Sequence, residues 1–389
     1  MTSRDKPRVV WVTPGSFPVP YAGSSSVERV VAEVSRRLAP YAEVTVVGRL
    51  GAGQARSETI DGVAYRRVPR MRPLAYAKAA AAIVRRLAPD VVIAENRPRL
   101  ARELKRRCPP GCKVWLSLQS TTFVAPHHIG RAELRACFKS ADRIVANSDF
   151  LRRRLAALVP SAAGKIAVNH LGVDPDAFPS RWDDPQALER EELLASHGAT
   201  GRKVLLYVGR LQPYKGVHHL LEAMPAVAAA HPDALLFVVG GAYYGSRRTS
   251  AYSRRLQRMA RRLRGHVRFV PYEPHDRVAR WFRAADIAVV PSSAREAFGL
   301  VNAEAMASGV PVVATNAGGI GEVVAHGETG LLVPLRNVPD GLAAAVSELL
   351  RDPERMRAYG EAGRRRALTF FTWQATAMRL AAMLGVGGV

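Results

Sequence analysis

The stretch spanning residues 291–314 constrains the fold of this chain more than any other part of the sequence. It follows the apolar run 286–290, which has the length of a buried parallel strand. Apolar residues recur at helical spacing from Leu300 onward, Gly309 ends that helix, and residues 310–314 begin a further strand. A helix that begins beside a glycine, just beyond the carboxyl end of a parallel strand, is a ready-made anion site. The stretch therefore predicts an α/β domain that binds an anion at this turn.

Two carboxylates flank the turn, Glu296 in the loop and Glu304 in the helix. Isolated glutamates are most often solvated surface residues, but these two stand in the frame E-x-F-G-L-x-x-x-E-A-M-A-x-G-x-P-V-V-A-T. The frame resembles the donor-binding signature of retaining glycosyltransferases of family 4, which have the two-domain GT-B fold. The alternative that it leaves open is an unrelated doubly wound domain with a glycine-rich turn.

A second signature of the same family, G-R-L-x-x-x-K-G, begins at Gly209 and follows an apolar strand. It places Arg210 and Lys215 between the end of that strand and the start of a helix. A guanidinium makes forked contacts with a diphosphate and an ammonium acts on it as a point charge. The signature therefore predicts a diphosphate site, and the alternative is an ordinary pair of surface cations.

The resemblance covers essentially the whole chain and implies the GT-B fold, in which two Rossmann-like domains with doubly wound parallel sheets face a central cleft. The expected acceptor-binding domain covers residues 1–173, together with a C-terminal helix at 369–389 that returns to it. The expected nucleotide-sugar-binding domain covers residues 174–368. The pattern is most similar to the bacterial spore-coat-associated branch, because of residues 96–99, 208–216 and 240–245.

Apolar runs separated by helical segments agree with two parallel sheets joined by right-handed crossovers. In the first half, strands are expected at 9–12, 43–48, 90–94, 113–118 and 142–148, and a helix at 27–38. In the second half, strands are expected at 204–209, 235–241, 267–272, 286–290, 310–314 and 330–333, and a terminal helix from residue 371.

By this resemblance the protein moves a hexose or N-acetylhexosamine from a UDP-linked donor to a hydroxyl of a small-molecule or glycan acceptor, with retention and without a metal or other cofactor. Arg210 and Lys215 would stabilise the leaving diphosphate, Glu296 would orient the sugar, and Glu304 would bind the ribose. The further donor-binding residues that the resemblance implies are Gly23, Ser24, Gly209, Tyr272, Phe298, Gly299 and Leu300.

The sequence departs from the family pattern at two places in its first half. Gly23 is followed by Ser24 where adjacent glycines are usual, and Gln119 stands where a histidine is usual. Glutamine cannot exchange a proton at neutral pH, but its amide can donate a hydrogen bond. Gln119 is nevertheless assigned to the catalytic set. The acceptor-binding candidates are Asn96, Arg97, Gln119, His127 and His128, the two histidines being exposed loop residues in the alternative interpretation.

Composition limits the other possibilities. A chain of 389 residues with 48% hydrophobic and 23% charged residues is typical of a globular protein with two cores. No apolar run approaches the ~20 residues of a membrane span, and the chain enters a strand almost at once, without a signal-peptide pattern. We therefore expect a cytoplasmic protein.

Neither the cysteines nor the acidic pairs predict a metal site. Cys108, Cys112 and Cys137 are too few for a disulfide framework, and no fourth zinc ligand stands at suitable spacing. Asp174 and Asp176 form a nominal D-x-D with a proline between them, in the passage between the two domains, so a turn is expected there.

The formal net charge of +24 predicts attraction to anions. Nucleotide-sugar phosphates are the expected partners, and at most weak electrostatic association with lipid headgroups is expected. Nucleic acid is not expected, because the sequence has no helix-turn-helix pattern and no interleaving of basic and aromatic residues. The arginine-rich segment 243–264 is expected to be an outer helix with a solvated basic face, and a membrane or partner surface is its alternative.

The sequence leaves three other functions open. A GT-B epimerase of UDP-N-acetylhexosamine would need acid and base groups around the sugar. A non-catalytic coat or scaffold protein could keep the fold, which Gln119 favours and the retained Arg210, Lys215, Glu296 and Glu304 disfavour. A membrane-bound transferase would take a lipid acceptor.

Overall fold

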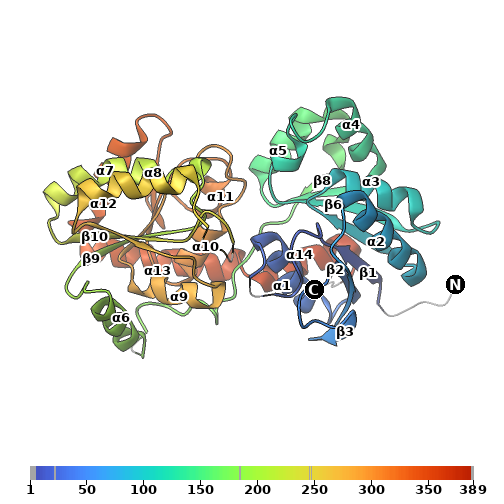
Figure 1. Ribbon diagram of the computed structural model, residues 1–389, viewed down its shortest axis with the longest axis horizontal. Coiled ribbons are helices and arrows are strands. Elements are labelled where there is room, and N and C mark those ends of the chain that lie inside the picture. Colours follow the sequence, from blue (N-terminus) through green and yellow to red (C-terminus); the bar gives the residue numbers. More distant parts are fainter. Residues whose placement is uncertain (1–5, 22, 184, 245, 247, 387–389) are drawn as a thin grey trace. The chain divides into compact units, whose positions relative to one another are not determined.

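The chain divides into two compact units in the computed structural model, which describes residues 6–21, 23–183, 185–244, 246 and 248–386 (Figure 1). The first unit consists of Met1–Leu171 with Trp373–Val389, and the second of Gly172–Thr372. Residues 245 and 247, which belong to two of the segments singled out in the sequence, lie outside the described residues.

Among its described residues, the first unit has an eight-stranded sheet in the order β3-β4-β2-β1-β5-β6-β7-β8. Its strands are parallel except for the antiparallel pair β3–β4, which the sequence analysis did not predict. The strands are β1 (Arg8–Val12), β2 (Glu43–Arg49), β3 (Ser57–Ile60), β4 (Val63–Val68), β5 (Val91–Glu95), β6 (Lys113–Leu118), β7 (Arg143–Ala146) and β8 (Ile166–Val168).

Helices cover both faces of this sheet (Figure 1). One layer contains α2 (Pro73–Leu87), α3 (Pro98–Arg107), α4 (Arg131–Ser140) and α5 (Asp149–Leu158), and the other contains α1 (Ser26–Leu38) and α14 (Trp373–Leu384). Two 3₁₀ turns complete the unit, η1 (Thr122–Val124) and η2 (Pro160–Lys165). The terminal helix α14 packs beside α1 and is tied to the segment after β8, because Thr376 Oγ1 donates to the His170 carbonyl at 2.9 Å.

The sheet of the second unit is parallel throughout, in the order β11-β10-β9-β12-β13-β14. Its strands are β9 (Lys203–Val208), β10 (Ala234–Val239), β11 (Val267–Val270), β12 (Ile287–Val290), β13 (Val312–Thr315) and β14 (Gly330–Val333). These strands are near-continuous apolar runs because helices bury both faces of the sheet.

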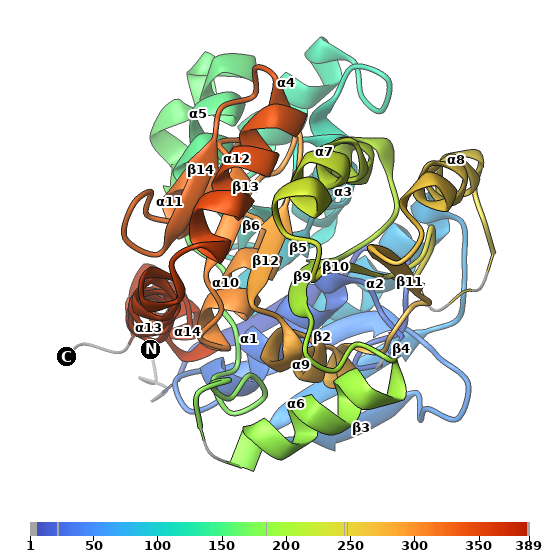
Figure 2. The ribbon, with the colours of Figure 1, turned by 90° about the vertical axis from the view of Figure 1, so that its left-hand side faces the viewer.

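Figures 1 and 2 show the helical layers of the second unit. One face carries α7 (Val217–Ala230), α8 (Ala251–Ala260) and α12 (Val338–Leu350), and the other carries α6 (Pro185–Ser196), α9 (His275–Ala284), α10 (Leu300–Ala307) and α13 (Pro353–Phe370). The shorter elements are α11 (Ile320–Val323) and the 3₁₀ turns η3 (Pro213–Lys215) and η4 (Arg261–Leu263). The core between α7, α12 and the sheet includes Leu220, Leu236, Val289 and Leu342, all fully buried.

Strand order reverses once in each sheet, which marks the place where ligands bind in open α/β sheets. In the first unit β1 lies between β2 and β5, and in the second β9 lies between β10 and β12. The loops at the carboxyl ends of β1 and β5, and of β9 and β12, therefore form the candidate crevices of the two units.

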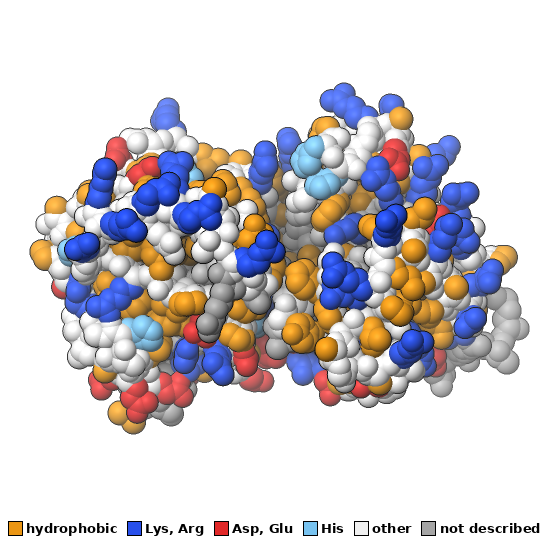
Figure 3. All heavy atoms as spheres, viewed as in Figure 1, with side chains coloured by type: hydrophobic (Ala, Val, Ile, Leu, Met, Phe, Trp, Pro, Cys, Tyr) orange, Lys and Arg blue, Asp and Glu red, His pale blue; other side chains and the backbone are white. Residues whose placement is uncertain are grey.

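The arginine-rich segment folds as an outer helix that is shorter than expected. Helix α8 begins only at Ala251, because Ser250 and Ser253 form a capping box there. Its Leu256 is fully buried, whereas Arg254, Arg255 and Arg258 are exposed. Figure 3 shows basic side chains gathered over this part of the surface.

The described residues contain no helix long and apolar enough to cross a membrane. In the same residues, no group of three or more His, Cys, Asp or Glu side chains is arranged to hold a metal ion. Cys108, Cys112 and Cys137 are all free thiols. In the D-x-D segment, the backbone N–H of Asp176 donates to Asp174 Oδ1 at 3.3 Å, as in a turn.

Candidate functional site

An ion pair joins the two sequence signatures at the reversal point of the second sheet. Lys215 Nζ lies 2.5 Å from Glu296 Oε2, although the two residues are 81 positions apart. Lys215 ends the turn after β9, and Glu296 stands in the loop after β12. Both side chains are mostly buried, with 20% of the Lys215 and 14% of the Glu296 side chain exposed. Sequence analysis assigned both residues to the site but did not predict that they contact each other.

Glycine lets the two loops come this close. Gly216 has φ +71°, and a Cβ there would lie 1.8 Å from the carbonyl oxygen of Pro291. The loops are also joined directly, since Ser293 N–H donates to the Tyr214 carbonyl at 2.8 Å. No other residue type permits this approach without moving one loop.

The surroundings keep both partners charged. Burial by itself raises the pKa of Glu296, but Lys215, a hydrogen bond from Ser292 and the charge of Arg210 together outweigh it, so that the pKa falls below the usual range. Burial likewise works to lower the pKa of Lys215, and Glu296 and Tyr214 outweigh it, so that this pKa is raised. The ion pair is therefore fully formed at neutral pH.

Arg210 is held between aromatic side chains beside this pair. Its guanidinium donates to Tyr214 Oη at 2.5 Å and lies 5.1 Å from the ring centroid of Tyr244. Its backbone carbonyl accepts a hydrogen bond from Tyr207 Oη at 2.9 Å. Sequence analysis missed these tyrosines; the signal for Tyr214 was its place inside the second signature. The arrangement orients a planar cation before any ligand binds.

Helix α10 begins at the same loop. Gly299 precedes it with φ +79°, and a Cβ there would lie 2.4 Å from Asn302 Nδ2. The first N–H groups of a helix have no partner within it, which makes Gly299 and Leu300 suitable for an anion. The side chain of Phe298 is buried and packs on Phe371 at 5.7 Å between ring centroids, so only its backbone can meet a ligand.

Glu304 is engaged by a histidine that sequence analysis did not single out. His275 Nε2 lies 2.9 Å from Glu304 Oε1, and the glutamate is buried. His275 begins α9, three residues after the predicted donor-binding residue Tyr272. The sequence signal for His275 was its place at the polar start of that helix. Gly209, the remaining predicted donor residue of this unit, lies between β9 and Arg210, and its N–H donates to the Val239 carbonyl at 3.0 Å.

The other predicted residues belong to the first unit. Gly23 and Ser24 lie before α1, where Ser24 N–H donates to the Tyr21 carbonyl at 3.0 Å. Arg97 follows β5 and is stacked on Phe123, with its guanidinium carbon 3.4 Å from the ring centroid, and it donates to Ser16 Oγ at 3.2 Å. Arg97 therefore bridges loops at the carboxyl ends of β1, β5 and β6.

The histidines of the acceptor prediction are exposed and stack on each other. The rings of His127 and His128 lie 4.4 Å apart, and His128 also contacts Phe123 at 5.0 Å between centroids. His128 is thus linked to Arg97 through the phenyl ring of Phe123, on which the guanidinium is stacked.

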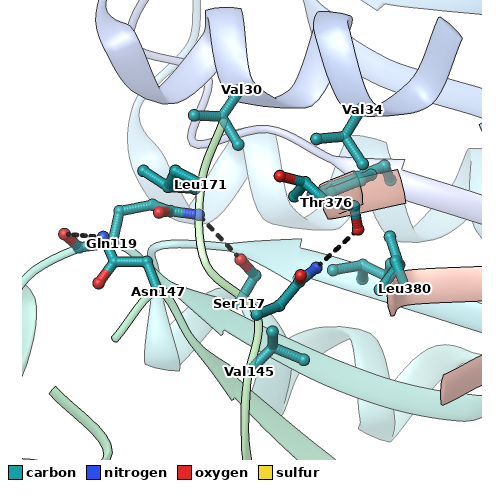
Figure 4. A pocket seen from close by; sticks show the side chains of 12 residues that line it. Val30, Val34, Ser117, Gln119, Val145, Asn147, Leu171, Thr376 and Leu380 are labelled. Carbon is teal, nitrogen blue, oxygen red and sulfur yellow. Dashed lines mark hydrogen bonds between the residues drawn. The ribbon is translucent and has the colours of Figure 1, made fainter. Parts of the chain in front are cut away.

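Gln119 is fixed at the end of β6 by its backbone (Figure 4). Its N–H donates to Asn96 Oδ1 at 3.3 Å, and its carbonyl accepts from Asn147 Nδ2 at 3.1 Å. Its side-chain Nε2 donates to Ser117 Oγ at 3.3 Å. Asn96 adopts φ +55° to make this contact, which is uncommon outside glycine. The structure thus brings Asn96 and Gln119 together through the backbone of Gln119; their acceptor-binding role stays a prediction.

Comparison with known proteins identifies the family. A family model described as Glycosyltransferase Family 4 matches residues 27–177, and one described as Glycosyl transferases group 1 matches residues 189–366. Spore coat protein SA of Bacillus subtilis (strain 168) is 30% identical over 373 residues, which are 96% of this chain and 98% of that protein. The chain belongs to glycosyltransferase family 4. The family and the spore-coat-associated branch that the signatures predicted are thereby confirmed.

Solved structures show the fold of this family 4 protein. Sucrose-phosphate synthase from Thermosynechococcus elongatus has a TM-score of 0.78 at 23% identity and covers 97% of this chain and 98% of that one. Anabaena Alr3699/HepE in complex with UDP has a TM-score of 0.77 at 20% identity and covers 97% of this chain and 99% of that one. The predicted GT-B fold is therefore confirmed.

Proposed function

We propose that this protein transfers a hexose or N-acetylhexosamine from a UDP-linked donor to a hydroxyl group, with retention at the anomeric carbon. The observation that carries the proposal is the Lys215–Glu296 ion pair beside Arg210, at the reversal point of the second sheet and the start of α10. Two fixed cations and a helix N-terminus match the charge of a diphosphate, and an ionised carboxylate accepts hydrogen bonds from sugar hydroxyls.

In the proposed reaction, the acceptor oxygen forms a bond to the anomeric carbon while the bond from that carbon to the diphosphate oxygen breaks. The acceptor proton passes to the departing diphosphate. Arg210 and Lys215 stabilise the charge that develops on that diphosphate, which is the largest electrostatic demand of the step. Glu296 stays an ion-paired carboxylate and orients the sugar, so it serves as neither nucleophile nor acid.

The nucleoside part of the donor is proposed from a buried carboxylate and from solved structures of the same fold. Glu304 is a buried carboxylate beside His275, and such a group can accept hydrogen bonds from ribose hydroxyls. A protein of the same fold is described in complex with UDP and another structure of it in complex with UDP-glucose. These observations make UDP the first nucleotide to test. We propose Arg97, Asn96 and Gln119 for the acceptor side, because they lie at the crevice of the first sheet.

A panel of nucleotides tests the donor proposal. UDP should raise the melting temperature more than GDP or ADP, because a ligand that binds only the folded state stabilises it, by about 2.7 kcal/mol at 100 times its Kd. With UDP-hexoses and a sugar acceptor, UDP should be released and the product should keep the anomeric configuration of the donor. EDTA should leave turnover unchanged. If no nucleoside diphosphate shifts the melting temperature, the donor site is wrongly assigned.

A structural role in a coat is the second candidate, because a relative at 30% identity is named Spore coat protein SA. The two candidates differ in one measurement. A coat protein that only keeps the fold needs neither Arg210 nor the Lys215–Glu296 pair for assembly, whereas a transferase loses turnover when either is changed.

A further inference from the structure

A buried carboxyl group lies directly behind Gln119 in the first unit. Glu95 is the last residue of β5, is 0% exposed, and pairs in register with Ser117 on β6. Because side chains alternate along a strand, Glu95, Ser117 and Gln119 belong to one face of the sheet. Trp11 on β1 donates from Nε1 to Glu95 Oε2 at 3.0 Å. Sequence analysis assigned no role to Glu95.

Three buried acceptor oxygens in the cluster around Glu95 lack a hydrogen-bond donor among the described residues. They are Oε1 of Glu95, Oε1 of Gln119 and Oδ1 of Asn147. Gln119 Nε2 donates one of its two amide hydrogens to Ser117 Oγ. Ser117, Gln119 and Asn147 also line a cavity of about 20 Å³ (Figure 4). Buried acceptors without donors are costly, so one further proton would relieve the cluster.

Glu95 is placed to hold such a proton. Burial raises the pKa of Glu95 to about 7, while the hydrogen bond from Trp11 and the neighbouring polar side chains of Ser117 and Gln119 limit the rise. The charged groups that act on it are Glu28 from α1, which raises the pKa further, and Arg97 from the loop after β5. The carboxyl group therefore changes its ionisation near neutral pH.

We propose that Glu95 is a positioning residue: as a neutral acid it donates a hydrogen bond into the Ser117–Gln119 pair and thereby decides which end of the Gln119 amide meets the ligand. The proposal rests on the proposed function, in which Gln119 contacts a substrate. Glu95 makes the hydrogen bonding of Gln119 depend on pH, which an amide side chain alone cannot do.

The two ionisation states reverse the direction of one hydrogen-bond chain. With ionised Glu95, the Ser117 hydroxyl donates to the carboxylate, Ser117 Oγ accepts from Gln119 Nε2, and the amide oxygen is the unpartnered end. With neutral Glu95, its O–H donates to Ser117 Oγ, the Ser117 hydroxyl donates to the Gln119 oxygen, and Nε2 becomes the available end. Only the neutral state offers an amide N–H to a substrate oxygen.

Turnover as a function of pH tests the proposal. In the wild type, kcat/KM for the UDP-sugar should fall about tenfold per pH unit above pH ~7 as Glu95 ionises. Glu95→Gln keeps an N–H donor at every pH and still accepts from Trp11, so this alkaline limb should disappear while activity is retained. Glu95→Ala should be impaired at every pH. Glu28→Gln, at another buried carboxyl group, should keep the alkaline fall in kcat/KM. The fall should occur at slightly lower pH, because Glu28 raises the pKa of Glu95. A limb that persists in Glu95→Gln overturns the proposal.

A spectroscopic readout separates this inference from the proposed function. In protein labelled with ¹⁵N-glutamine, the side-chain amide signal of Gln119, assigned by its loss in Gln119→Ala, should shift with a midpoint near pH 7. The shift should be absent in Glu95→Gln. A Gln119 signal that does not change between pH 5 and 9 in the wild type overturns the coupling. Absence of turnover with every nucleotide sugar, with the Gln119 titration present, contradicts the proposed function alone.

Discussion

At the scale of single residues, the Lys215–Glu296 ion pair affects the stability of the fold as well as the proposed chemistry. Removing one partner leaves the other charge unpaired in a mostly buried site. The free energy lost in this way exceeds the net contribution of the intact ion pair to stability. The roles of the two residues therefore cannot be separated by single substitutions alone, and a double-mutant cycle is needed.

The first prediction concerns this pair. Lys215→Met should lower the free energy of unfolding by roughly 2 kcal/mol, because Glu296 keeps its charge but loses its ion-pair partner. It should also lower turnover about a hundredfold, the effect expected for one lost cation at a developing anion. Adding Glu296→Gln should restore most of the stability and none of the turnover, as measured by urea unfolding and UDP release. Normal turnover in Lys215→Met would remove the diphosphate role.

The second prediction uses the opposite pKa shifts of Glu296 and Glu95. The folded pKa of Glu296 lies below the ordinary 4.5, so its stabilisation is fully present above pH ~4.5 and is lost as the pH falls through the folded pKa. The folded pKa of Glu95 is about 7 against an ordinary 4.5, so its stabilisation is fully present below pH 4.5 and is lost as the pH rises through about 7.

Urea unfolding between pH 3 and 8 checks the two opposite pH dependences of the free energy of unfolding. Relative to the wild type, Glu296→Gln should lose most stability near neutral pH and progressively less in acid. Glu95→Gln should gain stability relative to the wild type as the pH rises from 4.5 to 7, and should gain no more above about pH 8. Parallel curves for wild type and Glu95→Gln would show that Glu95 titrates normally in the folded protein.

At the scale of elements, the site depends on two loops that follow neighbouring strands. β9 and β12 pair in the sheet although β10 and β11 separate them in the sequence. Their loops meet where Gly216 lies against Pro291. The position of Lys215 is therefore set by backbone contact between loops and not by the side chain alone.

The third prediction follows from that contact. Gly216→Ala should lower turnover to a degree similar to Lys215→Met, because the added Cβ would lie 1.8 Å from the Pro291 oxygen and must push Lys215 away from Glu296. Gly111→Ala is the matched control, since Gly111 also has positive φ, +84°, but nothing lies within 4 Å of its Cβ position. Gly111→Ala should lose about 1 kcal/mol of stability to backbone strain, and Gly216→Ala should lose more because its Cβ also meets the Pro291 backbone. Equal turnover in the two variants would contradict the loop argument.

At the scale of the whole molecule, the net charge of +24 is spread unevenly. Residues 245–272 contain no acidic residue, and the arginines of α8 are exposed. On α5, by contrast, Asp149 forms ion pairs with Arg152 and Arg153. The excess positive charge of α8 is thus local and is not offset by its own segment.

The fourth prediction concerns anionic membranes. Each basic residue contributes about 1 kcal/mol near such a surface and is screened beyond about 8 Å at 0.15 M salt. Binding to anionic vesicles should therefore occur at low salt, be largely lost at 0.15 M, and not be needed for turnover. Replacing Arg254, Arg255 and Arg258 by serine should weaken it more than the same change at Arg152, Arg153 and Arg154. Tight binding at 0.15 M salt, with activity only when lipid is present, would indicate a lipid acceptor.

Local patterns in the sequence were enough to predict many of the helices and strands and the family. Glycine, proline and apolar spacing around residues 286–315 predicted β12, α10 and β13, because these signals act between near neighbours in the chain. The same local logic predicted β1, β2, β5 and β6. It missed the β3–β4 pair, whose alternating, partly exposed residues differ from the buried runs of the parallel strands.

Which of these residues contact one another depends on how the strands are ordered and paired in the folded protein. Lys215 reaches Glu296 and His275 reaches Glu304 because strand order in the second sheet differs from chain order. Glu95 lies behind Gln119 because β5 and β6 pair in one register, and a shift by one residue would turn its side chain to the other face. Its pKa of about 7 is a consequence of complete burial, and burial depends on how helices cover the sheet, which no local pattern specifies.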